Sequence, residues 1–73
     1  MTPKFPSLNS RQVIAMLKRR GFALDRQSGS HAVFIHSDGR RTTVPIHGNR
    51  DLGKGILHQI MNDADLTPDD FVK

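Results

Sequence analysis

The fold is decided by one stretch of the sequence, residues 22–46, which reads FALDRQSGSHAVFIHSDGRRTTVPI. Strand-forming residues occur there in three short runs, separated by the turn signals Ser28-Gly29-Ser30 and Asp38-Gly39. Asp-Gly between two such runs is a strong short-range signal for a hairpin. The stretch therefore predicts three antiparallel strands, over residues 22–27, 31–37 and 40–46.

A two-residue loop at Asp38-Gly39 would also fix which side chains share a face of the sheet. One face would be apolar and point to the core, and it comprises His31, Val33, Ile35, Thr42, Val44 and Ile46. The opposite face would carry Ala32, Phe34, His36, Arg41, Thr43 and Pro45. In the first hairpin, a turn around Ser28-Gly29 would add Phe22 and Leu24 to the apolar face. The same register places Arg26 opposite His31, so we expect His31 on the rim of the core with Arg26 beside it.

Helical patterns flank the three strands. Asn9 or Ser10 can cap a helix over residues 11–20, whose apolar residues recur at helical spacing. A second helix is predicted from Lys54 to about residue 62, and a last short helix after Thr67. The order α-β-β-β-α, with a short C-terminal helical turn, predicts an α+β fold of two layers. In that fold the helices cover one face of a three-stranded antiparallel sheet.

Length and composition restrict the function classes. The chain has 73 residues, which is enough for one domain over residues 1–73, and it has no cysteine. A disulfide framework, a cysteine-ligated zinc and a thiol nucleophile are therefore excluded. No apolar run approaches the length of about 20 residues that a membrane helix needs. The first residues lack the apolar core of a secretory signal, so we expect a cytoplasmic protein and no membrane partner.

The charge is uneven along the chain. The net charge is +4, but residues 1–62 hold ten basic residues against three aspartates, a net of +7. Residues 63–73 hold four aspartates against one lysine, a net of −3. A basic body of this kind favours a polyanionic partner such as nucleic acid, although a solvated basic face is an equally good interpretation of the charge alone.

Three patterns bear on chemistry. The four histidines are spaced five, eleven and eleven residues apart, which matches no common metal-ligand spacing, so no metal site is predicted. Residues 48–54 match G-x-x-x-x-G-K, but Gly55 stands where a phosphate-binding loop has Ser or Thr. Lys54 at the start of a helix remains a plausible contact to a single phosphate. His31 is the best candidate for proton transfer, with Arg26 as a neighbouring cation.

A further observation joins these pieces. The segment RQSGSH (residues 26–31), the strand end TVPIH (residues 43–47) and the segment GKGIL (residues 53–57) resemble the HicA toxin family. The resemblance runs from about residue 8 to residue 71. HicA toxins are small bacterial mRNA endoribonucleases, or mRNA interferases, of type II toxin–antitoxin systems. Many members carry two consecutive histidines, and Ala32 stands here in place of the second.

The resemblance implies a fold like that of the double-stranded-RNA-binding domain. It implies that His31 is the catalytic histidine and that Gly29 and Ser30 shape the turn that presents it. No cofactor is expected, because attack by a 2′-hydroxyl on the adjacent phosphate needs no metal. The expected substrate is mRNA, cleaved without the ribosome, with Arg26 and Lys54 as phosphate contacts. The expected partner is a HicB-like antitoxin that covers the active site.

Two points stay open in this interpretation. His47, near the opposite strand end, is a candidate for the second proton carrier. Ala32 is expected on the face opposite His31, where it would affect substrate contacts more than proton transfer. The alternative functions are a noncatalytic RNA-binding module of the same fold and a protein-interaction domain.

Overall fold

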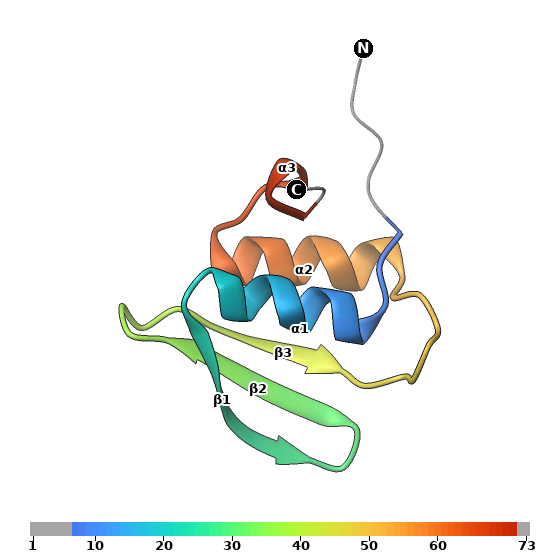
Figure 1. The fold of residues 1–73 in the computed structure, drawn as a ribbon, viewed down its shortest axis with the longest axis horizontal. Coiled ribbons are helices and arrows are strands. Elements are labelled where there is room, and N and C mark those ends of the chain that lie inside the picture. Colours follow the sequence, from blue (N-terminus) through green and yellow to red (C-terminus); the bar gives the residue numbers. More distant parts are fainter. Residues whose placement is uncertain (1–6, 72–73) are drawn as a thin grey trace.

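The computed structural model describes residues 7–71, and its first element is α1 (Ser10–Arg19) (Figure 1). Asn9 caps this helix through a reciprocal pair of hydrogen bonds, each 2.9 Å long. Its side chain accepts from the Gln12 N–H, and the Gln12 side chain accepts from the Asn9 N–H. These bonds satisfy backbone donors that the first turn of a helix leaves unpaired. The predicted cap at Asn9 is confirmed.

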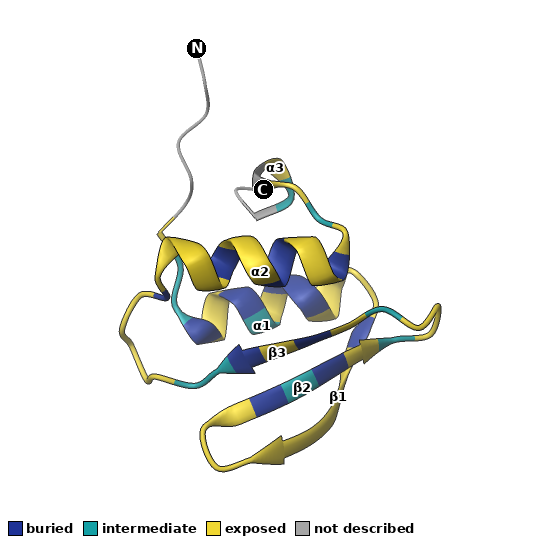
Figure 2. Ribbon diagram, turned by 180° about the vertical axis from the view of Figure 1, so that it is seen from behind, coloured by how far each residue is buried: buried dark blue, intermediate teal, exposed yellow. Residues whose placement is uncertain are grey.

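Three strands follow in the order of the chain and form one antiparallel sheet, β1-β2-β3. They are β1 (Phe22–Ser28), β2 (His31–His36) and β3 (Arg41–Pro45). The helix α2 (Lys54–Ala64) and the short helix α3 (Pro68–Phe71) complete the fold. Figures 1 and 2 show α1 and α2 side by side on one face of the sheet, with the other face uncovered. The predicted α-β-β-β-α order and the two-layer α+β fold are confirmed.

The core lies between the two long helices and the even-numbered residues of β2 and β3. Its largest fully buried side chain is Phe34, which is 2% exposed, and Leu17 of α1 and Leu57 of α2 pack in the same cluster. Figure 2 shows that β1 is mostly exposed, and Phe22 is its one buried residue. The outer part of the β1–β2 hairpin therefore extends beyond the helices.

The β2–β3 turn differs from the predicted one. It is a three-residue loop, because the N–H of His36 donates to the carbonyl of Arg40 at 2.8 Å and the N–H of Gly39 donates to the carbonyl of His36 at 2.9 Å. Gly39 has φ 99°, and Asp38 does not have a positive φ. A two-residue turn of type I′ needs a positive φ at both central residues, so Asp38 excludes it.

The β1–β2 turn is also displaced from its predicted position. Its two central residues are Gly29 and Ser30, and Ser28 pairs with His31. Gly29 has φ 58° and Ser30 has no positive φ, which is the requirement of a type II′ turn. A bulge at Asp25 then shifts the register between Leu24 and Arg26. Arg26 therefore pairs with Val33, and the predicted pairing of Arg26 with His31 is wrong.

These shifts reverse the faces of β2. Ala32 and Phe34 are buried at 1% and 2% exposure, whereas Ile35 is 36% exposed. The prediction that His31, Val33 and Ile35 point to the core is wrong, because both faces of β2 are apolar and the turns decide between them. In β3 the predicted inward face, Thr42 and Val44, is confirmed. Leu24 was expected in the core and is 50% exposed, because the helices do not reach that part of β1.

The acidic end of the chain folds back on α1. The Arg20 guanidinium forms an ion pair of 2.9 Å with Asp70 of α3. The Asp70 carboxylate also accepts hydrogen bonds from the Thr67 N–H at 2.8 Å and from its hydroxyl at 3.1 Å. These bonds, the backbone one foremost, hold the pKa of Asp70 below its ordinary value. Over residues 7–71, no helix combines the length and the apolar character that crossing a membrane requires.

Candidate functional site

His31 is the first residue of β2 and directly follows the β1–β2 turn. Because Ala32 points into the core, the alternation of the strand turns His31 to the uncovered face of the sheet. Its side chain is exposed and forms no hydrogen bond or ion pair with any other residue of the described range. An imidazole in this position is accessible to a large substrate and can both accept and donate a proton near neutral pH.

A pocket of about 310 Å³ opens beside His31, where the uncovered face meets α2. Its polar lining includes His31, His47, Thr43 and Gln59. Its apolar lining comprises Pro45, Ile56 and Ile60. Two imidazoles in one open, partly apolar pocket are a suitable pair for proton transfer to and from a bound group.

A backbone hydrogen bond fixes the two histidines relative to each other. The N–H of Ile46 donates to the carbonyl of Ser30 at 2.6 Å. Ser30 directly precedes His31, and Ile46 directly precedes His47. The bond therefore joins the β1–β2 turn to the end of β3 directly beside both histidines. Gly29 allows the turn to close, so Gly29 and Ser30 position the backbone of the candidate site.

The two predicted phosphate contacts lie outside the pocket lining. Arg26 pairs with Val33, two pairs along the ladder from the Ser28–His31 pair, so it projects from the same face as His31. Lys54 is the exposed first residue of α2. Neither cation has a partner within residues 7–71. The structure thus brings His31 and His47 together and leaves Arg26 and Lys54 at the periphery.

Thr43, Gln59 and Ile56 were not predicted as members of the site. The wrong register put Thr43 on the face opposite His31, whereas Thr43 and His31 line the same pocket. Gln59 and Ile56 reach the pocket only because α2 packs along β3, and their local sequence carries no sign of this. Ala32 is 1% exposed, so it has no surface for the substrate contacts that the sequence led us to expect.

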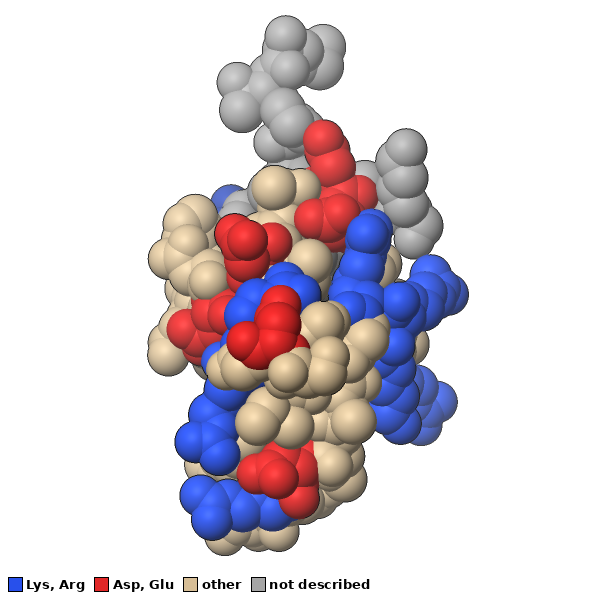
Figure 3. Space-filling model, turned by 90° about the vertical axis from the view of Figure 1, so that its left-hand side faces the viewer, with Lys and Arg blue, Asp and Glu red and all other residues tan. Residues whose placement is uncertain are grey.

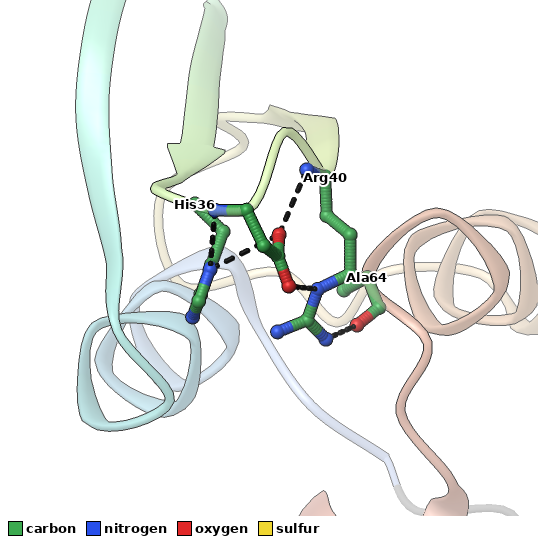
Figure 4. Close-up of polar contacts among 4 residues, drawn as sticks. His36, Arg40 and Ala64 are labelled. Carbon is green, nitrogen blue, oxygen red and sulfur yellow. Dashed lines mark hydrogen bonds and ion pairs between the residues drawn. The ribbon is translucent and has the colours of Figure 1, made fainter.

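His36, at the other end of β2, lies in very different surroundings (Figure 4). Its Nδ1 accepts a hydrogen bond from the Asp38 N–H at 3.1 Å. A nitrogen that accepts this bond carries no proton, so its 3.1 Å contact with the Asp38 carboxylate is not an ion pair in that state. The ring also packs edge-on against Phe22, with centroids 5.1 Å apart. His36 is therefore a structural residue.

Arg40 completes this cluster, which we call the His36 cluster (His36, Asp38, Arg40 and Phe22). Its Nε donates to the Asp38 carboxylate at 2.8 Å, its backbone N–H donates to the same group at 3.0 Å, and its Nη1 donates to the Ala64 carbonyl. Its guanidinium also lies 5.2 Å from the centre of the Phe22 ring. The bonds from Arg40, the backbone one foremost, hold the pKa of Asp38 below its ordinary value.

Charge is not segregated at the end of the molecule where the β2–β3 turn lies. Figure 3 shows acidic side chains there between two groups of basic ones. Across residues 7–71, no group of three or more His, Asp or Glu side chains is placed to hold a metal ion.

The chain matches one family of known proteins over most of its length. The profile of that family, described as HicA toxin of bacterial toxin–antitoxin systems, matches residues 10–66. The match includes the three strands, α2, His31 and His47. Toxins of this family are generally ribonucleases. No individual curated protein shows significant similarity to the chain.

Proposed function

Since the chain belongs to the HicA toxin family, we propose that it is an mRNA endoribonuclease that acts without the ribosome and uses His31 as its catalytic residue. One observation carries the proposal. His31 is an exposed imidazole without a partner in the described residues, and it shares an open pocket with His47. Acting on mRNA would place the toxin in the cytoplasm.

The simplest reaction for this pocket is attack by the 2′-hydroxyl of a ribose on the adjacent phosphate. A general base removes the proton of the 2′-hydroxyl while its oxygen bonds to phosphorus. A general acid gives a proton to the 5′-oxygen of the next nucleotide as its bond to phosphorus breaks. The products are a 2′,3′-cyclic phosphate and a 5′-hydroxyl, and the sequence of steps needs no metal ion.

His31 performs one of these two proton transfers, and His47 is the candidate for the other. Both line the pocket, and the Ser30–Ile46 hydrogen bond keeps their backbone positions fixed. Arg26 projects from the same face as His31, and we assign it to the phosphates of the bound strand. Lys54, next to the exposed N-terminal end of α2, is a second phosphate contact.

The partner that neutralises the toxin is proposed to be a HicB-like antitoxin. A pocket on the uncovered face of the sheet can be closed by a protein surface laid over it. The exposed apolar side chains Ile35 and Ile56, at 36% and 37% exposure, offer contact area on either side of β3 for such a surface.

The test is cleavage of a defined single-stranded RNA by the wild type and by His31→Ala, with analysis of the product ends. We expect 2′,3′-cyclic or 3′-phosphate ends from the wild type, and product formation about 10³-fold slower from His31→Ala. His58→Ala is the matched control, because it removes an exposed imidazole of α2 outside the pocket. Equal cleavage by wild type and His31→Ala would exclude His31 as the catalyst.

Two other outcomes decide between functions. Products with a 3′-hydroxyl and a 5′-phosphate, or a strict need for a divalent metal, would contradict the mechanism. Salt-sensitive RNA binding by both proteins without any cleavage would identify a noncatalytic RNA-binding module, which the net charge of +7 over residues 1–62 would support.

A further inference from the structure

A second pocket, of about 290 Å³, lies outside the candidate active site. It is formed where the first turns of α1 approach the segment that follows β3. Its lining comprises Ser10, Arg11 and Ile14 from α1 and Ile46, Gly48 and Asn49 from that segment. We call it the α1 pocket.

The α1 pocket combines an apolar floor with a polar rim. Ile14 and Ile46 are half-buried and pack against the core, so each presents part of its side chain to the pocket. Arg11 and Asn49 are exposed and form no hydrogen bond or ion pair with another residue of the described range. No acidic side chain is among the lining residues.

The position of the α1 pocket is fixed relative to the candidate active site. Ile46 lines the α1 pocket, and the next residue, His47, lines the pocket of His31. Three backbone hydrogen bonds hold the connecting segment. Besides the Ser30–Ile46 bond, the Arg50 N–H donates to the His47 carbonyl at 3.2 Å, and the Leu52 N–H donates to the Leu8 carbonyl at 2.8 Å. The distance from His31 to the α1 pocket is therefore fixed, and an RNA strand bound at His31 can place a particular flanking nucleotide at the α1 pocket.

We propose that the α1 pocket binds the base of an unpaired nucleotide that flanks the scissile phosphate. The proposal rests on the proposed ribonuclease function. Proteins read single-stranded RNA by taking unstacked bases onto flat side chains and bonding their edges. Ile14 and Ile46 supply an apolar surface, the Arg11 guanidinium supplies a plane and a positive charge, and the Asn49 amide both donates and accepts hydrogen bonds. An absence of acidic lining residues suits an anionic strand.

The test combines protein variants with abasic RNA. The cleavage site of one 20-nucleotide RNA is mapped first, and then RNAs with a single abasic nucleotide at each flanking position are compared by kcat/KM. The variants are Asn49→Ala and Arg11→Ala. Asn62→Ala and Lys18→Ala are the matched controls, because they remove an exposed amide and an exposed cation outside the α1 pocket.

We expect one flanking position at which the wild type loses about 5- to 150-fold in kcat/KM without its base, as is typical of a stacked base. For Asn49→Ala and Arg11→Ala, removing the base at that position should lower kcat/KM only slightly, because each variant already lacks a contact to the base. For the control variants, removing the base should lower kcat/KM as much as it does for the wild type. The same base dependence in all five proteins at every position would overturn the proposal.

The failures are distinguishable. A wild type that cleaves no RNA refutes the ribonuclease function and the base pocket with it. Normal cleavage without coupling between the variants and an abasic position refutes the base pocket alone. In the latter case, weaker inhibition of Asn49→Ala by a purified HicB-like antitoxin would assign the pocket to the partner protein.

Discussion

His36, at the C-terminal end of β2, is held on three sides, whereas His31, at the N-terminal end, is held only by its backbone. The His36 ring accepts a hydrogen bond from Asp38, packs against Phe22 and lies so close to Gly21 that a Cβ there would come within 2.8 Å of its Nε2. The His31 ring is exposed and lines an open pocket. The residue type alone therefore says little about the role of a histidine, and its contacts say much more.

The largest expected effect separates activity from stability at these two ends. His31→Ala should lower RNA cleavage by about 10³-fold, the range for a general acid or base, and leave the urea midpoint unchanged. His36→Ala should lower the free energy of unfolding by about 1–2 kcal/mol and leave the cleavage rate per folded molecule nearly unchanged. Cleavage rates and urea titrations of both variants measure the two quantities. A large stability loss in His31→Ala would remove the contrast.

Alanine substitution of the glycine near each histidine should also destabilise the His36 end more than the His31 end. Gly21 has φ 93° and faces the His36 ring, whereas Gly29 has φ 58° and an added Cβ would meet nothing within 4 Å. We expect Gly21→Ala to cost about 2 kcal/mol and Gly29→Ala about 1 kcal/mol of unfolding free energy.

The double variant Gly21→Ala/His36→Ala tests the cause. If the ring and the new Cβ compete for space, the two losses should sum to less than their separate values. Fully additive losses would mean that backbone strain at Gly21 acts alone.

A smaller effect is expected from the arginines. Arg40→Lys keeps the charge, but lysine lacks the planar guanidinium that bonds both the Asp38 carboxylate and the Ala64 carbonyl. The substitution should therefore lower the free energy of unfolding by about 1 kcal/mol. Arg26→Lys, at the His31 end, should change the free energy of unfolding by no more than about 0.5 kcal/mol. Urea denaturation of both variants checks this. Equal losses would mean that the His36 cluster is not the more tightly held end.

The smallest expected effect is on how the stability of the fold depends on pH. The pKa of Asp38 and that of Asp70 are held below the ordinary value, so each carboxylate stabilises the fold above that value of 3.8. This stabilisation falls as the pH drops below 3.8 and the folded protein takes up protons. Unfolding midpoints measured from pH 6 down to pH 2.5 should therefore fall less steeply for Asp38→Asn than for the wild type. Parallel curves for the two proteins would contradict the assignment.

The helices and the order of the elements were predictable because their signals are local. Asn9 and Gln12 cap α1 with their own side chains, and the turns contain the glycines that positive φ angles need. The faces of β2 were not predictable from alternation, because Val33 and Ile35 are as apolar as Ala32 and Phe34. The face of β2 that points to the core depends on whether the loop at Asp38-Gly39 has two residues or three. A register shift of one residue exchanges the two faces of a strand.

The candidate site was predictable only in part. His31 was singled out first as an imidazole expected beside Arg26 and then by the family resemblance, and its catalytic role stays a prediction. The pocket that joins His31 to His47 depends on the Ser30–Ile46 bond and on where α2 packs. Both are tertiary features, so the membership of Thr43 and Gln59 had no signal in the sequence.

The bulge at Asp25 also protects the free edge of the sheet. β1 is an edge strand that the helices leave exposed, and an edge of this kind can template the addition of a strand from a second copy. The bulge interrupts its regular spacing of donors and acceptors, and Asp25 adds a charge that pairs with Arg41 at 3.6 Å. β1 is thereby a poorer template for the addition of a further strand.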